Sequence, residues 1–240
     1  MAKGQELTQT LDGRSIIRTL EILRNRIAER FPTRGLTKTA IQLLDIARIT
    51  ADEAEKLRYP NWPLRILWII VTAFGFWGLF MLIKSQYIII ISSEKELTDF
   101  AQGLEATFNI IAICSLVVFF CFRYEATLKR RTALTGLYRL RAISHVIDMH
   151  QLTKDPESIV GKARTSSSPL RDLDQVQLMR YLDYCTEMLS LTGKLAALYS
   201  QYYPDTQVVA AVNDVEQLTT NLSRKIWQKI VLVQGKPESD

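Results

Sequence analysis

The sequence predicts an all-α integral membrane protein with a two-helix transmembrane hairpin and a cytoplasmic helical bundle. Two apolar stretches, residues 64–83 and 108–122, interrupt an otherwise polar chain of 240 residues. At about 1.5 Å per residue, stretches of this length cover much of the ~30 Å hydrocarbon core of a bilayer. Elsewhere, apolar residues recur at helical spacing, and no alternation typical of a strand competes with it.

The first predicted domain, residues 1–62, contains two amphipathic helices. Apolar residues at helical spacing over 16–27 define the first helix, and Pro32 follows its end. The second helix is expected over 38–58, because Pro60 cannot continue it. Their apolar faces lack the Trp and Phe typical of interfacial anchors, so we expect them to pack on the C-terminal bundle rather than lie on the membrane.

The second predicted domain, residues 63–124, is the transmembrane hairpin, with a short external loop at 84–106. Its first span follows Arg65 and is uncharged up to Lys84. Its second span is extended to 106–124, with Arg123 reaching the interface at its end. Four consecutive isoleucines follow Lys84 after a short interval, and we expect the first helix to continue through them beyond the bilayer.

The third predicted domain, residues 125–240, is a helical bundle that continues the second membrane helix. No proline occurs between Arg123 and Asp155, so this helix is expected to project into the cytoplasm. Pro, Gly and Ser then predict a loop at 152–171. Two further helices are expected at 172–202 and 206–233, and an antiparallel bundle is the simplest arrangement for them.

The distribution of basic residues predicts the orientation. Lys84 and Lys95 are the only basic residues of the external loop, whereas Lys and Arg flank both spans on the other side. The positive-inside rule therefore places both termini in the cytoplasm of a multi-pass protein of an inner or plasma membrane. The net charge of +5 does not indicate a nucleic-acid partner, because the basic residues do not form an aromatic-interleaved stripe.

No pattern in the sequence indicates an enzyme, a cofactor or a metal site. Walker, dinucleotide-binding, HExxH and nucleophile-elbow motifs are all missing. His145 and His150 lie about 140° apart around a helix, so both cannot bind one ion without a break in it. The three cysteines, Cys114, Cys121 and Cys185, do not form a Cys-x-x-Cys motif and are expected to be packing residues.

The preferred function is a membrane-anchored interaction or sensor module that presents the cytoplasmic bundle to a protein partner. Tyr181, Tyr184 and Trp227 are the candidate partner-binding residues, because Tyr and Trp are enriched at the centres of interfaces. Beyond the lipid bilayer itself, the expected partners are a cytoplasmic protein and further copies of the chain.

The alternative function is a homo-oligomeric pore or channel built from two-helix subunits. Asn109 and Ser115 are the candidate pore-lining residues, because they are polar positions within the second span. Gly75 and Gly78 are candidates for close helix packing, either within the hairpin or between copies.

Overall fold

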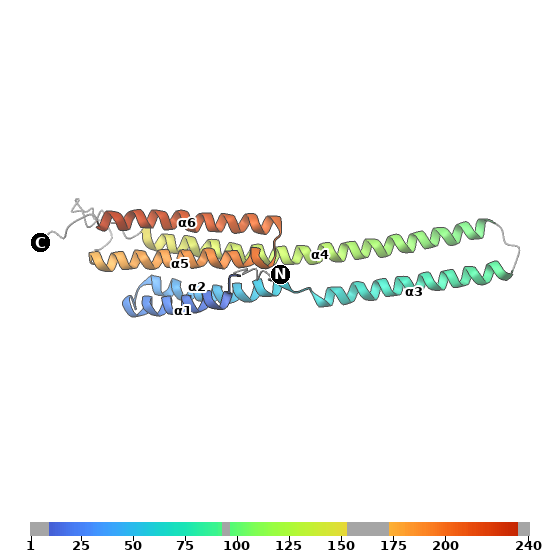
Figure 1. The fold of residues 1–240 in the computed structure, drawn as a ribbon, viewed down its shortest axis with the longest axis horizontal. Helices are drawn as coiled ribbons and strands as arrows, with labels where there is room; N and C mark the ends of the chain where they lie inside the picture. Colours follow the sequence, from blue (N-terminus) through green and yellow to red (C-terminus); the bar gives the residue numbers. More distant parts are fainter. Residues whose placement is uncertain (1–9, 93–96, 153–172, 235–240) are drawn as a thin grey trace, which may run out of the picture. The chain divides into compact units, whose positions relative to one another are not determined.

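The fold is all-α, as the sequence predicts. The structure, a computed structural model, describes residues 10–92, 97–152 and 173–234, and no strand occurs among them. The helices are α1 (Gly13–Arg30), α2 (Gly35–Arg58), α3 (Trp62–Ser92), α4 (Leu97–Leu152), α5 (Gln175–Tyr202) and α6 (Thr206–Gln234) (Figure 1).

The chain divides into two compact units. The first, hereafter the bundle, comprises residues up to Arg58 and from Arg130 onward, and the second, hereafter the hairpin, comprises Tyr59–Lys129. Helix α4 contributes its first part to the hairpin and its last part to the bundle. The predicted domains 1–62 and 125–240 are therefore joined in one unit.

In the bundle, α1 and α2 form a pair that packs on α5, and α5 packs along α6 (Figure 1). The expectation that the N-terminal helices pack on the C-terminal bundle is confirmed. One apolar core runs through these helices and the last part of α4, and includes Leu23, Leu43, Leu137 and Leu182, each at most 2% exposed. Full burial of such a side chain stabilises the fold by about 1.5–3 kcal/mol.

Side-chain caps determine where two bundle helices begin. The Asp12 carboxylate accepts hydrogen bonds from the backbone N–H groups of Arg14 and Ser15 at the start of α1. Asp174 and Gln177 form a reciprocal capping box at the start of α5. Asp174 is the N-cap and therefore precedes the helix, so α5 begins at Gln175. The sequence predicts a start three residues earlier, at 172.

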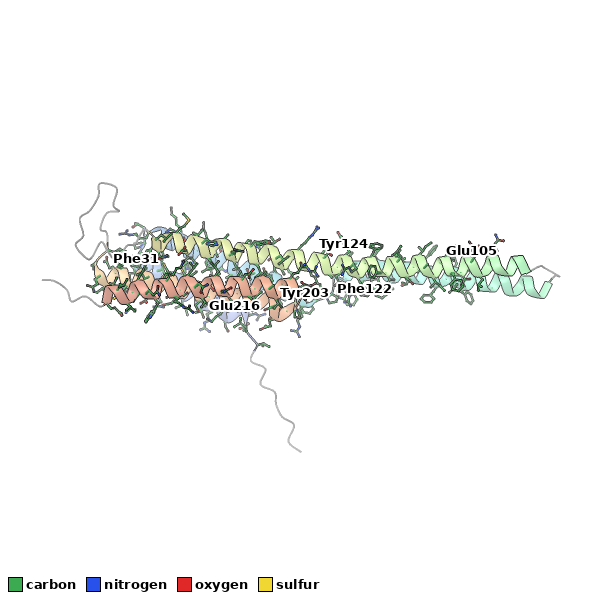
Figure 2. The ribbon with its side chains drawn as sticks, turned by 90° about the horizontal axis from the view of Figure 1, so that it is seen from above. Phe31, Glu105, Phe122, Tyr124, Tyr203 and Glu216 are labelled. Atoms are coloured by element: carbon green, nitrogen blue, oxygen red, sulfur yellow. The ribbon has the colours of Figure 1, made fainter. Side chains whose placement is uncertain are left out.

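In the hairpin, α3 and α4 are antiparallel helices whose apolar side chains are mostly exposed. Figure 2 shows these side chains along both helices, with Phe122 and Tyr124 labelled near one end of the hairpin and Glu105 nearer the other. By length and composition, two helical stretches of the described chain can cross a membrane, Gly35–Met81 and Gln102–Leu152. The first includes the polar α2, so its apolar part is α3.

The predicted external loop at 84–106 is wrong over most of its length. Helix α3 continues to Ser92, which confirms its expected extension past Lys84, and α4 already begins at Leu97. No proline or glycine occurs in residues 84–102, so the backbone carries no helix-ending signal there. The predicted loop at 152–171 lies, apart from Leu152, outside the described residues.

Candidate functional site

A buried carboxylate lies at the end of the hairpin where α3 begins. Glu125, on α4, is 8% exposed. Its Oε1 atom accepts a hydrogen bond from the backbone N–H of Asn61 at 3.1 Å and contacts the Lys129 ammonium, also at 3.1 Å. Arg65 Nε lies 3.8 Å from its Oε2 atom. These contacts join the first turn of α3 to α4.

The charge of Glu125 is stabilised by these neighbours. Burial alone would raise the pKa of its carboxyl, but the Asn61 N–H and the two cations together bring the pKa below its ordinary value. Sequence reasoning missed this residue. The signal for it was an isolated acidic position directly after the second apolar stretch, with basic residues on either side along the chain.

An apolar groove of about 400 Å³ lies between α3 and α4. Gly75 is one of its lining residues, and an added Cβ atom there would overlap Cys114 Sγ. A Cβ atom added at Gly78 would have no neighbouring atom within 4 Å. The structure thus assigns close helix packing within the hairpin to Gly75 and not to Gly78.

The two candidate pore-lining residues occupy different faces of α4. Ser115 lines the groove, whereas Asn109 is exposed and is not among the residues that line it. Six residues apart, they are about 120° apart around a helix. A straight α4 therefore cannot direct both side chains toward one pore axis.

Two of the three candidate partner-binding residues are buried. Tyr181 and Tyr184 are 2% and 4% exposed, because both rings pack edge-on against Phe31 with centroids 5.5 and 6.3 Å away. Their expected place on the bundle surface is therefore wrong. Phe31 lies beyond the end of α1, and no local pattern in α5 reveals that it covers these tyrosines. Trp227, in contrast, is 58% exposed on α6.

The bundle contains a polar cluster between α2, α4 and α5. The Tyr199 hydroxyl donates a hydrogen bond to Glu53 Oε2 at 2.8 Å, and the Arg139 guanidinium also contacts Glu53 Oε2. Burial and the Glu53 carboxylate both raise the pKa of Tyr199 above its ordinary value. Gly136 on α4 faces the Tyr199 ring closely enough that an added Cβ atom would overlap the hydroxyl.

The structure describes one fully buried thiol, Cys185 on α5. Burial raises the pKa of the Cys185 thiol to about 12, so this thiol stays protonated and unreactive at neutral pH. No cluster of three metal-binding side chains occurs within residues 10–92, 97–152 and 173–234.

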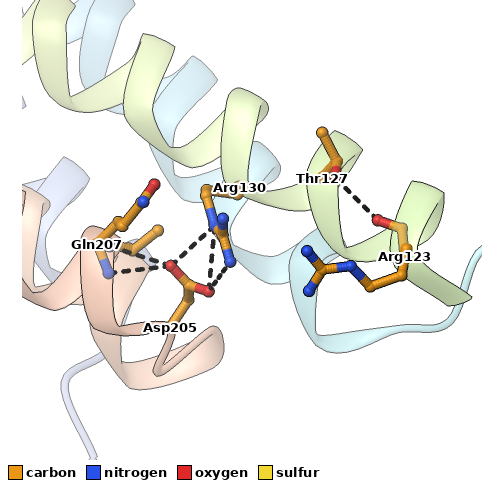
Figure 3. Close-up of polar contacts among 6 residues, drawn as sticks. Arg123, Thr127, Arg130, Asp205 and Gln207 are labelled. Atoms are coloured by element: carbon orange, nitrogen blue, oxygen red, sulfur yellow. Dashed lines mark hydrogen bonds and ion pairs between the residues drawn. The ribbon is translucent and has the colours of Figure 1, made fainter.

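A bidentate ion pair between Arg130 and Asp205 connects α4 to the start of α6. The Asp205 carboxylate accepts hydrogen bonds from Arg130 Nη2 at 2.7 Å and from Arg130 Nε at 3.1 and 3.2 Å (Figure 3). The same carboxylate accepts from the backbone N–H groups of Gln207 and Val208, and so caps α6. The hydrogen bonds from Arg130 hold the pKa of Asp205 below its ordinary value.

We expect Asp205→Ala to destabilise the bundle by about 1 kcal/mol more than Asp205→Asn, because asparagine keeps the cap and loses only the charge. The stabilisation from the ion pair is present above the ordinary aspartate pKa of 3.8 and is lost as the pH falls through the lower folded-state pKa. Thermal unfolding as a function of pH measures both effects. Equal stabilities of the two variants at neutral pH would contradict the capping role.

Comparisons with protein-family models, with curated proteins and with solved structures each found no match to this chain.

Proposed function

We propose that this protein is a membrane-anchored module. In this proposal α3 and residues 106–124 of α4 cross the bilayer as a hairpin, and the bundle faces the cytoplasm, where it binds a protein partner. Arginine and lysine at the polar end of the hairpin favour that end as the cytoplasmic one.

The observation that carries the proposal is the exposure of the apolar residues in both helices. None of the residues in the most apolar segment of either stretch is buried. Large side chains such as Phe74, Phe76, Phe108 and Phe120 are 60–72% exposed. Soluble monomers rarely expose so large a contiguous apolar surface, whereas a bilayer covers it on every side.

Trp227 is the proposed contact residue on the bundle. Val231, one helical turn further along the same face of α6, is 49% exposed. A partner that covers this apolar surface would bury the indole ring, and such Trp residues are frequent hot spots of binding.

Site-specific photo-crosslinking in native membranes tests the partner proposal. A crosslinker at Trp227 should give one dominant protein adduct, and the same crosslinker at Asp183, a partly exposed position on α5, should give none. Introducing Val231→Asp should reduce the adduct at position 227 about thirtyfold, the scale of a hot-spot residue. Equal adducts at both positions would contradict a defined interface on α6.

A homo-oligomeric pore is the second candidate. The observation in its favour is that Asn109 and Ser115 are exposed polar residues on two faces of α4, so that one of them can face a pore axis. In hydrocarbon such groups favour another helix or water. The mass of the full chain in native-lipid nanodiscs tests this candidate, since a pore needs a closed ring of several copies and a monomer would exclude it.

A further inference from the structure

A polar hollow of about 420 Å³ lies on the bundle between the last turns of α1 and the first three turns of α5. It is lined by Arg26, Glu29, Arg30, Arg180 and Tyr184. These residues contribute three positive charges and one negative charge, which gives the lining a net charge of +2. A hollow lined mainly by charges of one sign attracts ions of the opposite sign, so this one favours an anion.

Two contacts with α5 hold the guanidinium group of Arg26 in place. Its Cζ atom lies 5.2 Å from the centroid of the Tyr184 ring, and its Nη1 atom lies 3.1 Å from Glu187 Oε2. The Tyr184 ring is itself fixed, because it is 4% exposed and packs against Phe31. A guanidinium group carries five N–H donors, so the contact through Nη1 leaves other donors for a ligand. Arg26 is thus oriented before an anion binds, which lowers the entropy cost of binding.

Arg180 and Arg30 add donors from the two helices. Arg180 Nη1 lies 3.7 Å from Asp183 Oδ2 on the same helix, and 53% of the Arg180 side chain is exposed. Arg30 is the last residue of α1 and is also exposed. Asp183 and Glu187 are not among the lining residues. Their carboxylates therefore orient two of the arginines at the edge of the hollow without filling it.

A doubly charged phosphate group matches this lining. Guanidinium groups donate parallel pairs of hydrogen bonds to phosphate oxygens, and arginine clusters recognise phosphate groups in many proteins. A phosphate monoester carries about −1.5 to −2 charges at pH 7, which offsets the lining charge, whereas a single carboxylate offsets half of it. The volume of about 420 Å³ also leaves room for an organic group on the phosphate.

The position of the hollow in the bundle favours a soluble ligand over a lipid. Arg180 and Tyr202 are 22 residues apart, which corresponds to about 33 Å along α5. Beyond Tyr202, Asp205 binds Arg130, the residue at which α4 enters the bundle. The hollow is therefore at the opposite end of the bundle from this entry point.

We propose that the hollow lined by Arg26, Arg30 and Arg180 binds the doubly charged phosphate group of a soluble phosphate monoester. This site goes beyond the function proposed above, because it requires neither the membrane anchor nor the apolar surface of α6. The bound phosphate would bridge α1 and α5.

Isothermal titration calorimetry of the full chain in an uncharged detergent, with glycerol phosphate as the probe, tests the site. Inorganic phosphate should displace glycerol phosphate, and failure to displace it would overturn the assignment of the site to the phosphate group. Dimethyl phosphate, a diester with one negative charge like a phospholipid phosphate, should bind about tenfold more weakly. Equally tight binding of the diester would overturn the requirement for a doubly charged group, and no binding of glycerol phosphate at millimolar concentrations would overturn the site.

Arg30→Gln should lower the affinity for glycerol phosphate about tenfold, the effect of one hydrogen bond between charged groups. It leaves intact the ion pairs of Arg26 and Arg180. Arg18→Gln is the matched control, because Arg18 is an exposed arginine of the same helix that does not line the hollow. It removes the same charge and should leave the affinity unchanged. Equal losses in the two variants would overturn the site and leave only diffuse attraction to a basic surface.

Glu29→Gln provides a change in the opposite direction, which a damaged fold cannot imitate. It removes the carboxylate among the lining residues and should raise the affinity for glycerol phosphate about threefold, the scale of an interaction between exposed charges. Thermal unfolding without ligand verifies that the variant is folded. An unchanged or lower affinity in a Glu29→Gln protein as stable as the wild type would contradict the role of the lining charge.

Discussion

Leu116→Arg should shift the second span strongly toward the uninserted state. Leu116 is 55% exposed near the middle of residues 106–124. An arginine at the centre of a membrane helix changes the apparent insertion free energy by about 3 kcal/mol, which corresponds to roughly a hundredfold shift toward the uninserted state. The ten strongly apolar residues of this span contribute at most about −3 to −6 kcal/mol, so one arginine removes a large part of that total.

A glycosylation acceptor added after the C-terminus and translation with microsomes measure this effect. In the wild type the acceptor should stay unmodified on the cytoplasmic side, and in Leu116→Arg it should be glycosylated because the second span no longer returns the chain. Ile22 in the bundle is also 55% exposed, so Ile22→Arg is the matched control and should leave the pattern unchanged.

A membrane-spanning α4 and a water-covered α4 predict opposite outcomes for this substitution. If α4 were covered by water, an arginine at an exposed position would change the free energy of unfolding by no more than about 0.5 kcal/mol and would improve solubility. An acceptor that remains unmodified in Leu116→Arg, together with a more soluble protein, would contradict the membrane proposal.

Gly136→Ala should lower the free energy of unfolding of the bundle by about 3 kcal/mol, the upper end of the range for overpacking in a core. The new methyl group would overlap the Tyr199 hydroxyl. Tyr199 is fully buried and hydrogen-bonded to Glu53, so its ring cannot move away without breaking that bond. An alanine would otherwise be favourable here, because glycine is the poorer helix former by about 1 kcal/mol.

Gly78→Ala provides the comparison, because nothing lies within 4 Å of an added Cβ atom there. That variant should be neutral or slightly more stable. Thermal unfolding of the full chain in nanodiscs, followed by circular dichroism and by hydrogen exchange in α4 and α5, measures both variants. A Gly136→Ala protein as stable as the wild type would contradict the close approach of α4 and α5.

The double variant Gly136→Ala with Tyr199→Phe separates the clash from the hydrogen bond. Removing the hydroxyl takes away the first atom that the methyl group meets, so the two substitutions should cost less together than the sum of their separate effects. Strict additivity would show that the two positions do not interact.

Much of the secondary structure could be predicted from the sequence, because helix-forming patterns and helix ends are local. Pro60 separates α2 from α3, and periodic apolar residues predict the bundle helices to within a few residues. The apolar stretches identify the two helices that can cross a membrane. The segment at 97–106 is helical although the sequence predicts a loop there, because neither its polar residues nor Gly103 ends a helix that is continuous with α4.

The candidate sites were harder to predict, because they depend on which surfaces meet. Tyr181 and Tyr184 have the composition of an interface, yet Phe31 covers them. Glu125 and Glu53 lie far along the chain from the residues they bind, Asn61 and Tyr199. A helical period reveals that one face is apolar, but it carries no information on the partner of that face.

The sequence by itself therefore determined the fold class, the number of apolar helices and the positions of most helix ends, since these follow from hydrophobic periodicity, length and capping chemistry. The tertiary structure alone decided that Phe31 covers Tyr181 and Tyr184, and that Gly136 rather than Gly78 faces a buried side chain. The physical reason is that contacts between distant segments depend on the complementary shapes of whole helix faces, which no local stretch of sequence specifies.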